Sequence, residues 1–230
     1  MNLPESPPVP RIVPIVEGEG ESDAAPELIG RILREYQRHN VRPSSVKKAQ
    51  GVGGLTRVGG LERLLQLACN EADASGILVI RDADELCPRD VARDFARRAR
   101  AVNPRIPVAI VVAKCEYEAW FLASLESIAG AEIDGRPGIL ANATCDEPES
   151  ERSAKGWITR HMPGSRAYKE TLDQLAMTRL IDIGHAQRNS RSFRRLCKAV
   201  IELCNAIDSG IGMVTPIIAD SELSPRPGRD

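Results

Sequence analysis

The chain has 230 residues, with 31 Lys and Arg and 32 Asp and Glu, which gives a formal net charge of −1. This length predicts one large domain, or one domain with an appendage. The near-neutral charge argues against a protein that coats nucleic acid with a strongly basic surface, although a local basic face is compatible with it.

The cysteines and the N-terminus predict a cytoplasmic protein. The six cysteines form no CxxC pair, which is typical of reduced thiols. The N-terminus shows no basic region followed by an apolar run, so a secretory leader is not expected. The longest apolar stretch, residues 106–113, is far below the length that spans a membrane.

Short apolar runs alternate with helical patterns in the first part of the chain. Residues 1–10 are rich in proline and predict a flexible tail. Residues 11–16 predict a strand, and residues 25–39 repeat apolar side chains at helical spacing. A short strand is expected within 41–49. Residues 51–61, GVGGLTRVGGL, hold five glycines and predict a flexible loop.

The next segments continue the alternation. Residues 61–72 predict a helix, and GILVI at 76–80 reads as a strand buried on both faces. Residues 88–102 predict a helix with Pro88 in its first turn. PVAIVVA at 107–113 is a second buried strand, and a helix is expected to start after it. This order predicts an α/β fold with a mainly parallel sheet flanked by helices.

The last part of the chain is expected to be helical. After the loop-rich segment come two helical patterns, at about 166–183 and 192–207. The expected organisation is a flexible tail over 1–10, an α/β core over 11–128, a loop-rich segment over 129–165, a C-terminal helical appendage packed on the core over 166–208, and a mostly flexible tail over 209–230.

Three acidic clusters share one topological position, the carboxyl end of an expected strand. They are Glu17 to Glu21 after the first strand, Asp82 and Asp84 after GILVI, and Glu116 and Glu118 after PVAIVVA. Sites in open parallel sheets lie beyond the carboxyl ends of the strands. If these strands are neighbours, the three clusters meet in space.

Carboxylates packed together repel one another, and a hard divalent cation removes that cost. Mg²⁺, with Mn²⁺ as a substitute, prefers oxygen ligands and takes one or two protein carboxylates. A bound metal ion polarises a phosphoryl oxygen and activates water. The glycines of VEGEGE, residues 16–21, would let the turn bend sharply, so that Glu17 stays at the strand tip and faces the aspartates.

A structural explanation of the same carboxylates stays open. They would then be solvated turn residues, or charges that the helix dipole favours at helix N-termini. Glu19 fits this explanation best. For Glu21, a site role and a cap on the following helix both stay open. For Glu118, the alternatives are a site role and a charge in the first helical turn.

Two motifs in this order resemble a known domain. Val-Glu-Gly-x-x-Glu at 16–21, followed by Asp-x-Asp at 82–84, resembles the Toprim domain of topoisomerases, bacterial primases and the overcoming-lysogenization-defect nucleases. EYEAWFLAS at 116–124, with YKETLDQ and SRSFRRL in the tail, resembles a family with a Toprim-like core, domain-of-unknown-function family 4276. The resemblance covers about residues 11–205.

The resemblance implies roles for individual residues. Glu17 matches the Toprim glutamate, a general acid/base or metal ligand, and Asp82 and Asp84 match the metal-binding Asp-x-Asp. Glu21 matches the second glutamate of the nuclease-type motif. Glu118, with Glu116, is carried over from the uncharacterised family alone.

The resemblance also implies a partner and a setting. It suggests a bacterial antiphage defence or mobile-element system with an ABC-type ATPase. The sequence holds no GxxxxGK[ST] motif, so the ATPase is expected in a separate chain. No membrane partner is expected, and an oligomer is compatible with the sequence.

Basic and aromatic residues add secondary candidates. Lys114 could meet a scissile phosphate as a catalytic residue, or lie in solvent at the strand end. Arg191, Arg194 and Arg195 could bind a nucleic-acid backbone, or form a solvated helix face. Trp120 and its neighbour Phe121 are expected in the core rather than as a platform for bases.

The leading hypothesis is a Mg²⁺-dependent nuclease or phosphodiesterase that acts on DNA or RNA. The alternative is a non-catalytic binding or sensor subunit of an ATPase complex. A third reading is a nucleotidyl or phosphoryl transferase that uses the same metal site.

Overall fold

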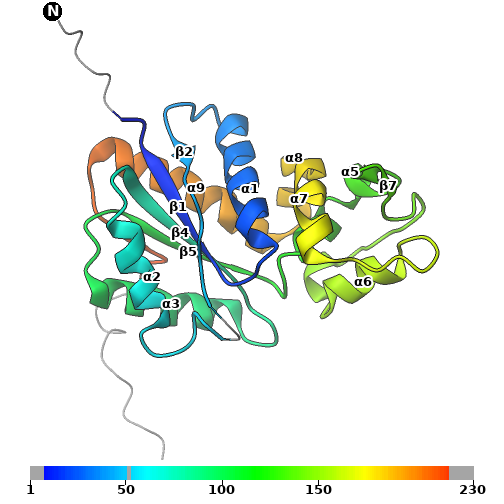
Figure 1. Ribbon diagram of the computed structural model, residues 1–230, viewed down its shortest axis with the longest axis horizontal. Coiled ribbons are helices and arrows are strands. Elements are labelled where there is room, and N and C mark those ends of the chain that lie inside the picture. The colour runs from blue at the N-terminus through cyan, green and yellow to red at the C-terminus, as the bar shows by residue number, and fades with distance from the viewer. Residues whose placement is uncertain (1–7, 51–52, 218–230) are drawn as a thin grey trace, which may run out of the picture.

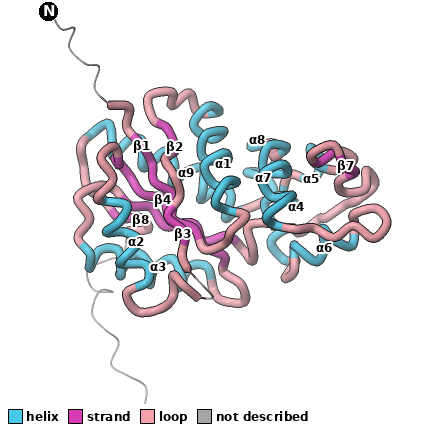
Figure 2. The backbone as a smooth tube through the Cα atoms, in the orientation of Figure 1, coloured by secondary structure: helices cyan, strands magenta, loops and turns pink. Residues whose placement is uncertain are grey.

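The computed structural model describes residues 8–50 and 53–217, and its centre is a parallel sheet (Figures 1 and 2). Within these residues the strand order is β2-β1-β4-β5-β8, β3 also pairs with β1, and every pairing in this sheet is parallel. The strands are β1 Arg11–Val16, β2 Arg42–Pro43, β3 Lys47–Lys48, β4 Ala74–Asp82, β5 Val108–Ala113 and β8 Val214–Thr215. This architecture confirms the expected α/β class.

Helices cover both faces of the sheet (Figure 1). On one face lie α1, Glu21–Glu35, and α9, Arg191–Ser209, and on the other lie α2, Gly60–Cys69, and α3, Pro88–Val102. Alternate strand residues serve the two cores, since side chains of a strand point to opposite faces in turn. In β4 for example, Leu78 and Ile80 belong to the first core, and Ile77 and Val79 to the second.

The register aligns the carboxyl ends of the three central strands at one edge of the sheet. Ile15 of β1 pairs with Val79 of β4, which in turn pairs with Ile110 of β5. Asp82, the last residue of β4, pairs with Ala113, the last residue of β5. The segments that follow β1, β4 and β5 therefore leave the sheet side by side, as expected for neighbouring strands.

A group of short elements lies beyond this edge, to the right of the sheet in Figure 1. They are α4 Ala119–Ala123, α5 Leu125–Ile128, β6 Glu132–Ile133, β7 Arg136–Pro137, the 3-10 helix η1 Pro148–Ser150, α6 Ala154–Arg160, α7 Glu170–Leu180 and α8 Ile183–Asn189. We call residues 119–189 the lobe. Its helix α7 packs against α1 of the core.

The structure differs from the sequence expectation in several segments. The loop-rich segment contains the β6–β7 hairpin and α6. The helical tail divides into α7, α8 and α9, of which α9 packs directly on β4 and β5 as one layer of the core. Val214 and Thr215, within the expected flexible tail, pair with β5 and cover the edge of that strand. The expected tails at 1–7 and 218–230 lie outside the described residues.

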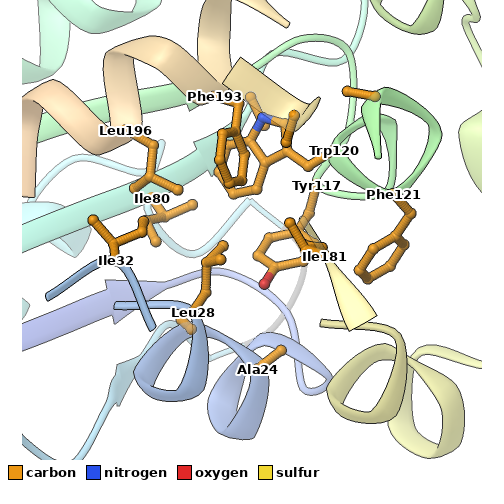
Figure 3. Packing of buried hydrophobic residues seen from close by; sticks show 14 of the residues in the cluster. Ala24, Leu28, Ile32, Ile80, Tyr117, Trp120, Phe121, Ile181, Phe193 and Leu196 are labelled. Atoms are coloured by element: carbon orange, nitrogen blue, oxygen red, sulfur yellow. The ribbon is translucent and has the colours of Figure 1, made fainter. Parts of the chain in front are cut away.

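The aromatic residues after β5 join the sheet to the lobe (Figure 3). Tyr117 contacts Trp120 and Phe121, with ring centroids 4.7 and 5.6 Å apart, and Trp120 meets Phe193 of α9 edge-on at 5.7 Å. The Trp120 indole N–H donates to Ser192 Oγ at 2.9 Å. Trp120 and Phe121 are fully buried, which confirms the expectation that they are core residues.

The described part of the chain contains no helix that is both long enough and apolar enough to cross a membrane.

Candidate functional site

An acidic cleft of about 760 Å³ opens where β1 and β4 end, between the sheet and the lobe. Among the described residues, its charged lining consists of seven carboxylates (Glu17, Glu19, Glu21, Asp82, Asp84, Glu118 and Glu170) and three basic side chains (Lys48, Arg81 and Lys155). Seven negative groups minus three positive groups leave a formal charge of −4. The five carboxylates expected at a metal site, Glu17, Glu21, Asp82, Asp84 and Glu118, all line this cleft.

Arg81 holds two of the expected site residues. Its guanidinium is almost completely buried, with Nε 3.4 Å from the Glu17 carboxylate and one terminal nitrogen 3.7 Å from Asp84. Burial raises the pKa of Glu17, and the positive charge of Arg81 opposes that rise. Arg81 also donates to the backbone carbonyl of Asp82 at 2.8 Å, so it organises the end of β4.

Glu21 folds back over the turn that precedes it. Its Oε2 atom accepts hydrogen bonds from the backbone N–H groups of Glu17, at 3.1 Å, and Gly18, at 2.9 Å. Burial raises the pKa of Glu21, and these two N–H donors oppose the rise. The carboxylate thus fixes the VEGEGE turn as well as lining the cleft. Glu19, by contrast, is largely exposed and pairs with Lys48.

Of the two glycines in this turn, Gly20 is the one that close packing requires. Neither Gly18 nor Gly20 has a positive φ, and Gly20 has helical dihedral angles as the residue before α1. A Cβ atom on Gly20 would lie 2.1 Å from Gln174 Oε1 and 2.8 Å from the backbone oxygen of Glu170. The bend over residues 17–19 therefore uses no left-handed backbone conformation at either glycine. The close approach of α7 leaves no room for a side chain at Gly20.

Glu118 lies at the centre of the junction between core and lobe. It is fully buried, and its Oε1 atom accepts hydrogen bonds from the Tyr168 hydroxyl at 2.8 Å and from Gln174 Nε2 at 3.4 Å. Its Oε2 atom has no hydrogen-bond partner within the described ranges, and the Nζ atom of Lys155 lies 3.9 Å away. Burial raises the pKa of Glu118 to about 7, although Lys155 and Tyr168 oppose the rise.

Asp82 shares this environment. Its Oδ1 atom accepts a hydrogen bond from the backbone N–H of Tyr117 at 2.8 Å, which ties the end of β4 to the segment after β5. Burial raises the pKa of Asp82 well above its ordinary value, and repulsion from Glu21 and Glu118 adds to the rise. These three carboxylates therefore form one electrostatically coupled group.

The lobe supplies cleft residues that were not expected from the sequence. Lys155 of α6 pairs with Glu170 of α7 at 2.5 Å and faces Glu118. Burial lowers the pKa of Lys155, but the attraction of Glu118 and Glu170 outweighs it and the net change is upward. Gln174 completes this wall. The segment YKETLDQ, one of the family-like stretches, contains Glu170 and Gln174 and was the available signal for them.

Other candidates lie away from the cleft. Lys114 is exposed and is not among the described residues that line the cleft. Its backbone N–H donates to Ser192 Oγ at 3.4 Å. Glu116 accepts a hydrogen bond from the backbone N–H of Lys155 at 3.2 Å, a contact that positions the start of α6. The structure thus gives Lys114 no place beside the carboxylates.

The arginines at the start of α9 are outside the cleft as well. Arg194 donates to the backbone oxygens of Gln187 and Arg188, so it caps the end of α8. Arg195 pairs with Glu202 at 2.7 Å and donates to Thr215 Oγ1 at 2.6 Å. Arg191 is exposed. Arg194 and Arg195 therefore have structural contacts of their own.

The chemistry of the cleft fits a hard cation in part. In the described residues, no group of three or more His, Cys, Asp or Glu side chains is arranged to hold a metal ion. Magnesium, however, is commonly bound through one or two carboxylates, with waters and substrate oxygens as its other ligands. The carboxylates that line the cleft offer oxygen ligands, and the buried Oε2 atom of Glu118 accepts no hydrogen bond from the described residues. Asp82 with Glu17 or Glu118 would suit such an ion.

The comparisons with known proteins give a family and no function. No curated protein and no solved structure matches the chain. The family model described as domain of unknown function (DUF4276) matches residues 16–201, which include every carboxylate of the cleft. The chain therefore belongs to the DUF4276 family.

Proposed function

We propose that this chain is a Mg²⁺-dependent phosphodiesterase of Toprim type, a nuclease that acts on DNA or RNA. The observation that supports it most is the convergence of Glu17, Asp82 and Glu118 in one cleft at the carboxyl ends of adjacent parallel strands. The order of these acidic groups along the chain is the order in which the Toprim resemblance assigns a catalytic glutamate and a metal-binding Asp-x-Asp.

In this proposal, Asp82 and Glu17 hold the metal, with Glu118 and Glu21 close by. The bound ion would neutralise the carboxylates, polarise a phosphoryl oxygen and promote ionisation of a water molecule. Glu118, with its pKa raised to about 7, suits proton transfer near neutral pH. Lys155 brings a positive charge to the same wall, where it would face the substrate phosphate.

The direct test is hydrolysis of bis(p-nitrophenyl) phosphate and of labelled DNA and RNA, each in Mg²⁺, Mn²⁺ or EDTA. Activity is expected with either metal and not in EDTA. Glu17→Gln and Asp82→Asn should abolish it while circular dichroism shows an intact fold. Full activity in both variants would overturn the proposal.

One observation favours a second candidate, a non-catalytic binding or sensor subunit of an ATPase complex. Arg81 already neutralises part of the charge of Glu17 and Asp84, so the cleft is partly compensated by its own side chains. This candidate predicts a stable complex with an ATPase and no metal-dependent turnover. The assay above distinguishes the two candidates.

The proposal also covers the compartment and the partner of the protein. We place the protein in the cytoplasm, in a bacterial defence or mobile-element system, with an ABC-type ATPase supplied by a separate chain. All six cysteines are free thiols, which is compatible with a reducing compartment.

A further inference from the structure

A second groove, of about 540 Å³, continues the acidic cleft toward α2. The two hollows share Lys48, Ala49 and Gln50 in their linings. The charged residues that line this groove in the described ranges are all basic: Lys47, Lys48, Arg57 and Arg63. We call it the basic groove. It adjoins the acidic cleft, whose formal charge is −4, so the charge of the surface changes from negative to positive across the shared residues.

The glycine-rich segment that forms one wall has a defined shape in its described part, 53–61. The backbone N–H of Arg57 and the hydroxyl of Thr56 both donate to the carbonyl of Gly53, at 3.0 and 2.9 Å. Leu55 is fully buried and anchors the turn, and Gly59 adopts a φ of 79° just before α2. Within the glycine-rich loop expected from the sequence, residues 53–59 form turns before α2, while residues 51–52 lie outside the described ranges.

This turn presents charge outward. Arg57 is exposed, and its guanidinium donates to the backbone oxygen of Gln50 at 2.6 Å. Among the described residues, no carboxylate pairs with it. The exposed side chain of Arg63 has no ion pair or hydrogen bond within the described residues. Lys47 and Lys48, by contrast, pair with Glu71 and Glu19.

An apolar side chain stands beside these cations. Val58, between Arg57 and Gly59, is completely exposed, and Leu67 of α2 is 43% exposed on the same groove. Neighbouring cationic and apolar groups suit a ligand that alternates charged and uncharged parts. A polynucleotide strand has this character, since charged phosphates alternate with sugars and bases.

We infer that the basic groove binds the phosphodiester backbone of a polynucleotide through Arg57 and Arg63 and leads the strand into the acidic cleft. A cleft of net negative charge repels a polyanion, so cations beside it are needed to hold the flanking phosphates. The inference rests on the proposed function for what happens in the cleft. It assigns substrate binding to α2 and its preceding turn rather than to Arg191, Arg194 and Arg195.

The test uses charge-removing variants in matched pairs. The groove variant is Arg57→Gln with Arg63→Gln. The control variant is Arg42→Gln with Arg179→Gln, two exposed arginines that line a different hollow beside α1 and lose the same total charge. Both full-length variants are compared with the wild type for binding to labelled single-stranded DNA, single-stranded RNA and duplex DNA. Fluorescence anisotropy is measured in EDTA over a series of salt concentrations.

The wild type should bind at least one of these polynucleotides with an affinity that falls as salt rises. In the groove variant, the slope of log affinity against log salt should be smaller by about two, because two phosphate contacts are lost. The control variant should keep the wild-type slope. Equal weakening in both variants, an unchanged slope in the groove variant, or no binding by the wild type would overturn the inference.

A second readout separates this inference from the proposed function. Hydrolysis of bis(p-nitrophenyl) phosphate, which is too small to reach along the groove, should be the same in the groove variant and the wild type. If the wild type fails to hydrolyse this diester but binds polynucleotides through Arg57 and Arg63, the nuclease proposal fails and the groove inference stands. If the wild type hydrolyses the diester but binds no polynucleotide, the groove inference fails and the catalytic proposal stands.

Discussion

Lys155 Nζ lies 3.9 Å from Glu118 Oε2, and the same nitrogen lies 2.5 Å from the carboxylate of Glu170. One lysine of the lobe is therefore shared between a buried carboxylate and a half-exposed one, and the closer contact goes to Glu170. Glu118 is left with a pKa raised to about 7 and with one oxygen that has no hydrogen-bond donor in the described part of the chain. This incomplete compensation predicts that the stability of the protein depends on pH.

The metal-free protein should lose stability as pH rises from about 5 to about 8. The folded pKa of Glu118 is about 7 against an ordinary 4.5, so the folded state binds more protons than the unfolded state between these values. Stability therefore falls through this interval, by about 3 kcal/mol for this group. The raised pKa of Asp82 acts in the same direction. Urea unfolding in EDTA across this pH range measures the effect.

Glu118→Gln is the control for this pH dependence. Glutamine keeps an oxygen for the Tyr168 hydroxyl and has no charge to desolvate. The variant should lose most of the decline in stability between pH 5 and pH 8. A decline as steep as that of the wild type would show that Glu118 does not carry it.

Replacing Lys155 by Met should destabilise the protein at pH 8, because the nearest cation to Glu118 is lost. In the Glu118→Gln background the same replacement should cost less. A double-mutant cycle by urea unfolding should give a coupling free energy of about 1–3 kcal/mol. Additive effects of the two substitutions would contradict a direct interaction.

Asp82→Asn should separate stability from metal response. Asparagine keeps an oxygen to accept the Tyr117 N–H, and it removes a charge that Glu21 and Glu118 repel. In EDTA at pH 8, the melting temperature should equal or exceed that of the wild type. Added Mn²⁺ should raise the melting temperature of the wild type and leave that of the variant unchanged. An equal rise in both proteins would place the metal elsewhere.

Gly20→Ala should destabilise the fold, by about 1–3 kcal/mol, because a Cβ atom there meets the backbone of Glu170 and the side chain of Gln174. Gly18→Ala is the matched control, since its Cβ would lie 3.5 Å from the nearest heavy atom, an ordinary contact. Thermal unfolding of the two variants gives the comparison. Equal stability of the two would contradict the packing of α7 on the VEGEGE turn.

The sequence predicted the sheet and much of the cleft because their signals are local. Continuous apolar runs identify β4 and β5, and the carboxylates that follow each strand are visible in the printed sequence. Parallel pairing then forces Glu17 and Asp82 toward one edge. The aromatic segment after β5 is apolar enough to predict burial of Trp120 and Phe121.

The lobe was harder to predict, because its role depends on contacts between distant segments. Lys155 sits in a polar stretch that reads as a loop, and its importance comes from Glu118 and Glu170, which lie on other elements. Arg81 likewise looks like a polar strand end, yet the fold buries it between Glu17 and Asp84. Lys114, although close in sequence to the acidic segment, is exposed and is not among the described residues that line the cleft, which agrees with the alternative of a solvated lysine at the strand end.

A crystal of the protein soaked in Mn²⁺, with anomalous diffraction measured at the manganese edge, tests the proposed metal site directly. An anomalous peak is expected in the acidic cleft, within about 2.5 Å of an Asp82 oxygen and of an oxygen from Glu17 or Glu118. A cleft with no anomalous peak, in which Arg81 and Lys155 keep their pairs with the carboxylates, would contradict the metal site and favour the non-catalytic subunit.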